Sequence, residues 1–144
     1  MIANPAVVPE FYVTDLGRSL RFYVDALGFE IDYERPESRF AALSFRGSRI
    51  MLEEISGTRA ASDEEFAQGG WRTGDLEFPF GRGVSLQISV LDVESAHARV
   101  LALGYQVRLG LRNRTYRMGD EVVEQRQFLV LDPDGYLIRL AQQH

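Results

Sequence analysis

Few side chains in this chain could carry out chemistry on a substrate. The sequence contains no cysteine, which excludes a thiol nucleophile, a thiolate metal site and a disulfide framework. Its two histidines are His97, within a segment of helical spacing, and His144, at the end of the sequence. A Ser-His-Asp arrangement would need an imidazole that can reach a serine, whereas we expect His97 to face solvent or to pack on its helix. Nucleophilic hydrolysis is therefore not expected.

Glu10 is the carboxylate that the sequence places best for binding or for acid–base chemistry. Side chains alternate across a strand, so Val8, Glu10 and Tyr12 share one face of the strand expected over residues 7–14. The opposite face, which should pack under a helix, carries Val7, Phe11 and Val13. We therefore expect Glu10 to face a pocket formed by a curved sheet.

Two stretches of the sequence are copies of one unit. The segment VVPEFYVTDLGRSLRFYVDALGFEIDY begins at Val7, and the segment VSLQISVLDVESAHARVLALGYQV begins at Val84. Asp15 in the first copy corresponds to Asp92 in the second. The pocket face of the first strand in the second copy is expected to carry Ser85, Gln87 and Ser89, with Gln87 equivalent to Glu10.

Each copy is expected to fold as a strand, a helix and then further strands. Asp15 and Asp92 stand where a helix N-cap accepts the first free amides, and Gly28 and Gly104 stand where a helix ends. The strands expected after the helices cover residues 29–34, 39–45 and 49–55 in the first copy, and 105–109, 113–118, 123–131 and 136–142 in the second. This order predicts an α+β fold of two βαβββ modules whose curved mixed sheets surround a cavity.

The modules are expected to form a single domain over residues 1–144. Module one covers residues 7–55, a connecting segment covers 56–82, and module two covers 83–142. Within the connecting segment, Ser62-Asp63-Glu64-Glu65 has the pattern of a helix capping box, so we expect a short helix there. Trp71 lies in the same aromatic-rich segment, which would serve either as a lid over a pocket or as a strap packed between the modules.

The composition is that of an ordinary globular protein, with 45% hydrophobic residues and a formal net charge of −5. The acidic balance argues against nucleic acid as a partner, because binding to phosphates needs a basic face. It suits a cationic ligand, or solubility alone. No apolar run is long enough to span a membrane, and the N-terminal residues lack the pattern of a secretory signal, so a cytoplasmic location is expected.

The run D-L-x-x-S-L-x-F-Y-x-x-x-L-G-F from Asp15 to Phe29, the closing D-P-D-G-Y from Asp132 to Tyr136 and the two βαβββ units together resemble the vicinal-oxygen-chelate superfamily. That superfamily includes glyoxalase I, fosfomycin resistance proteins, extradiol dioxygenases and bleomycin resistance proteins. The resemblance covers nearly the whole chain and is nearest to the bleomycin-resistance branch. It predicts the fold more strongly than the activity, because the superfamily supports many chemistries.

The resemblance implies that the metal site has been lost. Its metal-using members take ligands at positions that here correspond to Val8, Leu52, Ser85 and Arg139. None of these residue types binds zinc, nickel, manganese or iron, and an arginine puts a cation where the ion would be. A one-residue slip would replace Leu52 by Glu53, but a lone carboxylate cannot hold a metal. We therefore expect neither a metal nor another cofactor.

The same register points Arg139 into the pocket that Glu10 faces. Two interpretations of Glu10 stay open: it forms a buried ion pair with Arg139 that only fills the vacated site, or it attracts a cationic or hydrogen-bonding group of a ligand. Beside an arginine a carboxylate can also move protons, which is the form of enzyme that the sequence leaves possible. Five arginines near the C-terminal hairpin are interpreted instead as a solvated face balanced by acidic residues: Arg108, Arg112, Arg114, Arg117 and Arg126.

The resemblance thus implies a metal-independent small-molecule binding protein that confers antibiotic resistance by sequestering a cationic or aromatic antibiotic. In similar proteins the grooves of a homodimer draw on both subunits, and the same is expected here. The residues expected to line the ligand groove are Val8, Glu10, Tyr12, Leu52, Glu54, Trp71, Ser85, Gln87, Tyr116 and Arg139. The alternatives are a lyase, isomerase or oxygenase of the superfamily with a metal-free acid–base site at Glu10, and an interaction module without a ligand.

Overall fold

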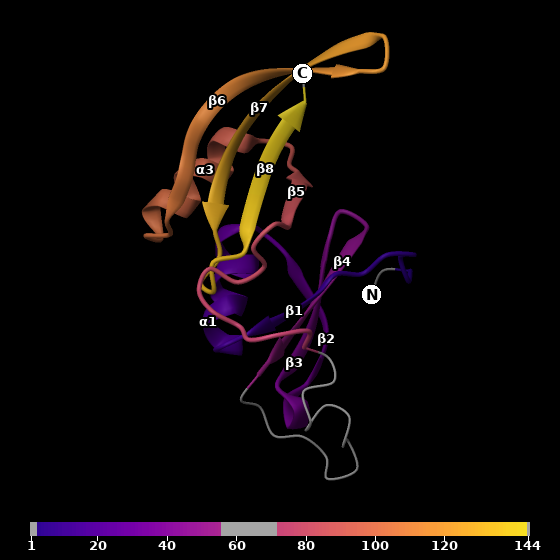
Figure 1. The fold of residues 1–144 in the computed structure, drawn as a ribbon, viewed down its shortest axis with the longest axis vertical. Coiled ribbons are helices and arrows are strands. Elements are labelled where there is room, and N and C mark those ends of the chain that lie inside the picture. The colour runs from indigo at the N-terminus through magenta and orange to yellow at the C-terminus, as the bar shows by residue number, and fades with distance from the viewer. Residues whose placement is uncertain (1–2, 56–71, 144) are drawn as a thin grey trace. The chain divides into compact units, whose positions relative to one another are not determined.

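A computed structural model of the chain describes residues 3–55 and 72–143. The chain divides into two compact units, Met1–Glu77 and Phe78–His144, which we call unit 1 and unit 2 and describe separately. Figure 1 shows residues 3–55 of unit 1 in indigo to magenta and unit 2 in rose to yellow. Modules one and two of the sequence analysis fall within these units, while their union into a single domain stays a prediction.

Unit 1 contains one mixed sheet of four strands in the order β1-β4-β3-β2, with β1 parallel to β4 and the other neighbours antiparallel. Its elements are β1 Glu10–Val13, α1 Leu16–Leu20, the π-helical turn η1 Arg21–Ala26, β2 Glu30–Arg35, the 3₁₀ turn η2 Pro36–Ser38, β3 Phe40–Phe45 and β4 Ser48–Glu54.

The helical segment of unit 1 begins and ends as predicted. The Asp15 carboxylate accepts the backbone N–H of Arg18 at 3.0 Å, and Gly28 follows the last turn with φ 89°, a value that only glycine adopts freely. The segment buries Phe22 and Tyr23 completely. One face of the sheet packs against this helical segment, and Phe11, Val13, Leu43 and Leu52 are buried on that face.

Unit 2 repeats this arrangement, with the sheet order β5-β8-β7-β6 and β5 parallel to β8. Its elements are β5 Ser85–Ser89, α3 Val93–Ala102, β6 Val107–Met118, β7 Glu121–Leu131 and β8 Leu137–Gln143. Asp92 caps α3 by accepting the backbone N–H of Ser95 at 3.0 Å. Under α3 the sheet buries Phe128, Val130, Ile138 and Leu140 completely, and His97 packs its ring edge-on against Phe128. The predicted α+β fold with two copies of one βαβββ unit is therefore confirmed.

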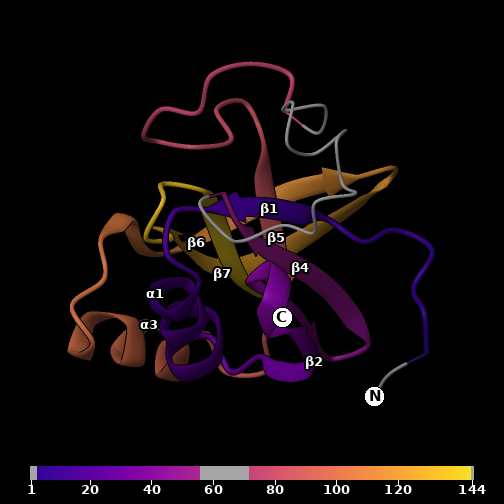
Figure 2. The same ribbon diagram turned by 90° about the horizontal axis from the view of Figure 1, so that it is seen from below.

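One strand of unit 2 differs from the prediction. Residues 105–109 and 113–118 were expected as separate strands, but they belong to a single strand, β6, paired with β7. The pairing shifts register twice, between Val107 and Leu109 and between Leu109 and Arg112, and such bulges let a strand continue while its alternation breaks. The β6–β7 hairpin, drawn in orange, extends past the end of β8 (Figures 1 and 2).

The closing D-P-D-G-Y motif is a turn with a structural role. The buried Asp132 carboxylate accepts the backbone N–H groups of Asp134 and Tyr136, each at 2.9 Å. Gly135 has φ 92°, and a Cβ there would lie 2.5 Å from Cα of Pro79. Glycine is therefore required at this position by both the backbone and the space. Burial, together with the charges of Asp132 and Asp134, raises the pKa of Tyr136 far above its usual range.

The expected capping-box helix at residues 62–65 and the lid or strap that contains Trp71 lie outside the described residues. Within residues 3–55 and 72–143, no helix combines the length and apolar character that crossing a bilayer requires.

Candidate functional site

The open face of the unit 2 sheet brings together several of the predicted site residues. Register pairs Gln87 on β5 with Arg139 on β8, and Arg139 with Leu129 on β7. Because registered neighbours point to the same side of a sheet, these side chains lie opposite the face that buries Ile138 and Leu140 under α3. The prediction that Ser85, Gln87 and Arg139 share a face is confirmed by this register.

A groove of about 290 Å³ lies on this face. Eight side chains from all four strands line it: Ser85, Leu109, Arg112, Arg114, Tyr116, Gln127, Leu129 and Arg139. Three of them, Ser85, Tyr116 and Arg139, were predicted from the sequence. Gln87 lies on the same face but does not line the groove.

A chain of hydrogen bonds fixes the Tyr116 hydroxyl in this groove. The Tyr116 oxygen accepts from Nε2 of Gln127 at 2.9 Å and from Nη1 of Arg139 at 3.3 Å. Gln127 is held in turn, because its Oε1 accepts Nε2 of Gln125 at 2.8 Å. With its oxygen engaged by two donors, the hydroxyl keeps its own proton for an acceptor in the groove.

The groove is positively charged. Burial raises the pKa of Tyr116, but the hydrogen bond from Gln127, the positive charge of Arg139 and smaller contributions from hydrogen bonds of Arg114 and Arg139 outweigh it, so this pKa lies below its ordinary value. The described part of unit 2 places no carboxylate within ion-pair distance of Arg112, Arg114 or Arg139. Among the residues that the structure describes, Arg112 donates to the backbone oxygen of Gly110 at 3.2 Å.

This arrangement corrects the interpretation of the arginine cluster. Arg112 and Arg114 line the groove, whereas Arg126 lies on the other face, where Nε donates to Glu94 of α3 at 3.0 Å. Arg117 is exposed and does not line the groove, because it is out of phase with Arg114 along β6. The cluster is therefore divided between two faces of the sheet, and Arg112 and Arg114, although exposed, line a groove.

In unit 1 the sheet assigns the predicted residues to different faces. Phe11 pairs with Leu52, which is completely buried on the helix side, and Tyr12 pairs with Glu53. Glu53 therefore lies on the open face in place of Leu52, which is the alternative that a one-residue slip would give. Leu52 does not lie on the open face, because parallel pairing with Phe11 turns it under the helix.

Glu54 shares the helix side with Leu52, and its contacts are structural. Its Oε2 accepts the backbone N–H of Leu16 at 3.0 Å at the start of α1, and it lies 3.5 Å from the guanidinium of Arg39. A carboxylate at a helix N-terminus stabilises the free amides there. Glu54, which was expected to line the ligand groove, therefore anchors the start of α1 instead.

Glu10 is exposed at the first residue of β1, and Val8, half-buried, precedes that strand. Of the two interpretations left open for Glu10, a buried ion pair would need a buried carboxylate, whereas Glu10 is exposed because the strand begins at this residue. Its ion pair with Arg139, which belongs to the other unit, stays a prediction. Tyr12 is half-buried on the open face, as expected, and Trp71 lies outside the described residues.

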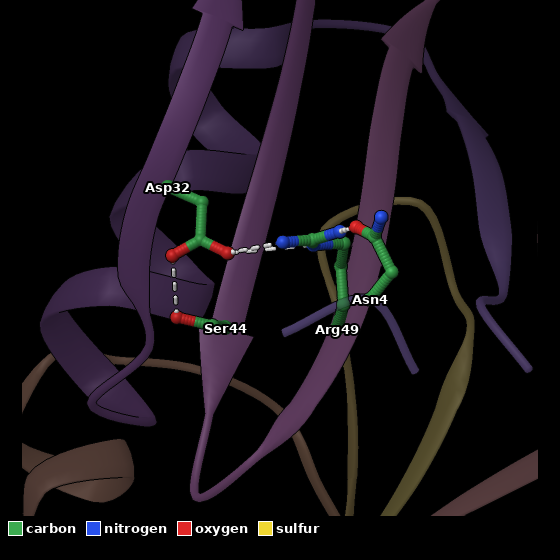
Figure 3. A network of polar contacts seen from close by, with 4 residues as sticks. All are labelled: Asn4, Asp32, Ser44 and Arg49. Atoms are coloured by element: carbon green, nitrogen blue, oxygen red, sulfur yellow. Dashed lines mark hydrogen bonds and ion pairs between the residues drawn. The ribbon is translucent and has the colours of Figure 1, made fainter. Parts of the chain in front are cut away.

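Sequence reasoning missed a polar network on the open face of unit 1 (Figure 3). The Arg49 guanidinium donates to Asp32 at 2.9 and 3.3 Å and to Asn4 at 2.8 Å, while Ser44 donates to Asp32 at 2.8 Å. The side chains of Arg49 and Asp32 are only 5% and 6% exposed. Chiefly through the hydrogen bond from Arg49, the pKa of Asp32 is lowered. All charges in this network are matched, so it serves to hold the sheet together and to fix the N-terminal segment on it.

The described residues do not fit a metal ion. Across residues 3–55 and 72–143, no three side chains of the histidine, aspartate or glutamate type come together in a possible ligand cluster. The positions that the family resemblance assigns to ligands carry Val8, Ser85, Arg139 and, in the register of the sheet, Glu53 next to Leu52. One carboxylate among these residue types does not make a metal site.

Comparison with known proteins identifies relatives over nearly the whole chain. The family model of the Glyoxalase/Bleomycin resistance protein/Dioxygenase superfamily matches residues 6–140. Proteins named bleomycin resistance protein from Geobacillus stearothermophilus and from Staphylococcus aureus are each 30% identical to this chain, and the alignment covers 94% of this chain and 95% of the relative.

Solved structures share the fold. TioX from Micromonospora sp. ML1 aligns with a TM-score of 0.69 at 22% identity, covering 98% of this chain and 100% of the other. The hypothetical protein SA1046 from S. aureus aligns with a TM-score of 0.66 at 17% identity, covering 97% and 94%. At these identities the likeness concerns the fold alone.

Proposed function

We propose that this chain, which belongs to the glyoxalase/bleomycin resistance protein/dioxygenase superfamily, is a small-molecule binding protein of the bleomycin-resistance type. The observation that carries the proposal is the 30% identity to proteins named bleomycin resistance protein over 94% of the chain. The groove on unit 2 supports the binding of a small molecule, because its lining combines the apolar side chains of Leu109 and Leu129 with fixed polar and positively charged groups.

Binding is proposed to be independent of metal. Val8, Ser85 and Arg139 stand at positions to which the family resemblance assigns metal ligands, and none of these side chains can replace an imidazole or a carboxylate. The protein would act by sequestration, which needs tight and stoichiometric binding but no chemical step. Resistance would then scale with the amount of protein rather than with a rate of turnover.

The ligand is proposed to be a cationic or aromatic antibiotic, held in grooves to which both subunits of a homodimer contribute. The exposed Glu10 and the half-buried Tyr12 on unit 1 would supply a carboxylate and an aromatic ring for such a molecule. A light-scattering measurement at micromolar concentration tests the dimer, and a monomeric mass would refute that part of the proposal.

Titration calorimetry with bleomycin tests the binding function directly. We expect saturable binding with one ligand per chain, and a rise in melting temperature equivalent to about 2.7 kcal/mol when the ligand is present at a hundredfold its dissociation constant. Prior treatment with a chelator should leave the affinity unchanged, and elemental analysis should find no stoichiometric transition metal. Absence of saturable binding, or its loss after chelation, would contradict the proposal.

Glu10→Gln tests the contribution of unit 1 to this binding. It should weaken binding of bleomycin about tenfold or less, because an exposed carboxylate contributes modestly, while stability barely changes. Glu30→Gln, at an exposed position of β2, is the matched control and should leave the affinity unchanged.

A further inference from the structure

We propose that the open face of unit 2 is a binding site for the anionic group of a small organic molecule, such as a carboxylate, phosphonate or sulfonate. The site consists of the arginines 112, 114 and 139 with the Tyr116 hydroxyl, in the groove of about 290 Å³. This proposal goes beyond the proposed function, since it specifies an anionic group where that function names a cationic or aromatic ligand. It stands whether or not bleomycin binds.

The positions of the three guanidinium groups follow from strand register. Arg112 and Arg114 are two residues apart on β6 and therefore point to the same side, where they pair with Gln127 and Gln125 on β7. Arg139, on β8, reaches the same groove from beyond β7. Cations on two strands, separated by a strand that carries glutamine amides, surround the space from two sides.

The charge of this group is not balanced within its unit. The described residues of unit 2 place no carboxylate in ion-pair distance of these arginines, in contrast to Arg126, which bonds to Glu94 at 3.0 Å on the opposite face. Like charges gathered in one groove repel each other, and an anion removes that repulsion while it accepts charge-assisted hydrogen bonds. A guanidinium is also suited to bind the two oxygens of a carboxylate or phosphonate together.

Tyr116 adds a donor that is already oriented. Its oxygen accepts from Gln127 and from Arg139, so its proton is directed toward a further acceptor, and an anionic oxygen is the strongest one available. Because Gln125 fixes Gln127, these donors are in place before a ligand arrives. Donors that are ordered in advance cost less conformational entropy on binding.

The remaining lining limits the class of molecule. Leu109 and Leu129 pair across β6 and β7 on this face and provide apolar surface next to the cations. A volume of about 290 Å³ lies at the small end of the range for ligand pockets, which begins at about 300 Å³. The groove therefore fits a compact organic anion with an apolar body better than a polyanion, and the formal net charge of −5 also disfavours nucleic acid.

Phenylphosphonate is a suitable probe, with benzyl alcohol as the neutral analogue and benzylamine as the cationic one. Backbone amide shifts in NMR titrations locate the binding, and we expect saturable shifts on β6 and β7 with phenylphosphonate only. Arg112→Gln with Arg114→Gln should weaken binding at least about tenfold, because each removes a charge-assisted hydrogen bond. Both residues are exposed, so the variant should keep its fold.

Arg108→Gln with Arg117→Gln is the matched control, since it removes two charges from exposed positions of the same strand outside the groove, and it should leave the affinity unchanged within about twofold. The proposal is overturned by equal losses in both variants, by equal binding of benzyl alcohol, or by no saturable shift up to about 10 mM phenylphosphonate. Arginine-dependent binding of a duplex oligonucleotide without binding of phenylphosphonate would also overturn it. A failure to bind bleomycin would contradict the proposed function and leave this site intact.

Discussion

The two units share a fold but treat the arginines on their open faces in opposite ways. In unit 1, Arg49 is buried and fully paired with Asp32 and Asn4, so that its charge stabilises the sheet. In unit 2, Arg112 and Arg114 line a groove and no carboxylate of the described residues in that unit pairs with them. The two units thus share their helix side, while the open face of unit 1 carries a paired structural network and that of unit 2 carries the groove proposed to bind an anion.

The features that the two units share are the N-caps of their helices and the order of the strands in their sheets. Asp15 and Asp92 cap the helices through the same bond to a backbone N–H three residues later, and in both sheets the first strand is parallel to the last. These features repeat because the helix ends and the sheet order depend on them in both copies. The open faces are free of that requirement, and there the copies differ.

The largest expected effect comes from removing the paired arginine. Arg49→Leu should leave the buried Asp32 carboxylate without its cation and remove the bond to Asn4, so the melting temperature should fall by many degrees. Arg112→Leu, in unit 2, should change it little, because no paired carboxylate is left behind. Thermal denaturation followed by circular dichroism compares the two variants. Similar losses in both would show that the difference between the open faces is not one of structural role.

A second comparison concerns the turns that join equivalent strands. In unit 1, β3 and β4 are joined through Gly47, with φ 86° and open space around it. In unit 2, β7 and β8 are joined through Gly135, with φ 92°, where a Cβ would lie 2.5 Å from the backbone of Pro79. Alanine at Gly47 should cost about 1–2 kcal/mol for the backbone conformation alone.

Gly135→Ala should cost more than Gly47→Ala by at least about 1 kcal/mol, because the new methyl group must displace the backbone of Pro79. Urea denaturation of both variants gives the two free energies of unfolding. Equal values would mean that the segment around Pro79 moves away without cost, and that the D-P-D-G-Y turn is no more constrained than the hairpin of unit 1.

Features that depend on local sequence could be predicted. Capping by Asp15, the glycine at the end of each helix and the burial of Phe11 and Val13 all follow from spacing along a single element. The internal repeat then supplied the second module by equivalence. Apart from the single strand β6, most of the secondary structure and the sides of the first strands could be predicted in this way, because neighbours in sequence determine them.

Features that depend on the pairing between strands could not be predicted from the sequence. Leu52 was placed on the open face, although its pairing with Phe11 turns it under the helix. Asp32 accepts a hydrogen bond from Arg49, which is 17 residues away in the sequence. Asp32 also lies at an irregularity in the pairing of β2, which the alternation of residue types does not predict. The sequence did hold a signal for the arginines of β6, because strand alternation puts Arg112 and Arg114 on one face and Arg117 on the other. Nothing in the sequence, however, favoured a groove lined by Arg112 and Arg114 over a solvated face.

The smallest expected effect is on the pH dependence of stability, and it again distinguishes the two open faces. The pKa of Asp32 is lowered in the folded protein, mainly by the hydrogen bond from Arg49, relative to an ordinary value of 3.8. A group whose pKa is depressed by folding stabilises the native state fully above its unfolded pKa. That stabilisation is lost as the pH falls below 3.8 and through the lower pKa of the folded state.

Asp32→Asn removes this titrating group, so the loss of stability between neutral pH and acid should be shallower in the variant than in the wild type. Its stability at neutral pH should be lower, because the paired carboxylate is gone, and the two curves should converge as the pH falls. Melting temperatures from pH 7 down to about pH 2 measure this convergence. Asp120→Asn, at an exposed turn of unit 2, is the control, and its curve should run parallel to that of the wild type. Parallel curves for Asp32→Asn as well would mean that the Arg49 network does not stabilise the charged carboxylate, and that the open face of unit 1 is held together by its apolar contacts alone.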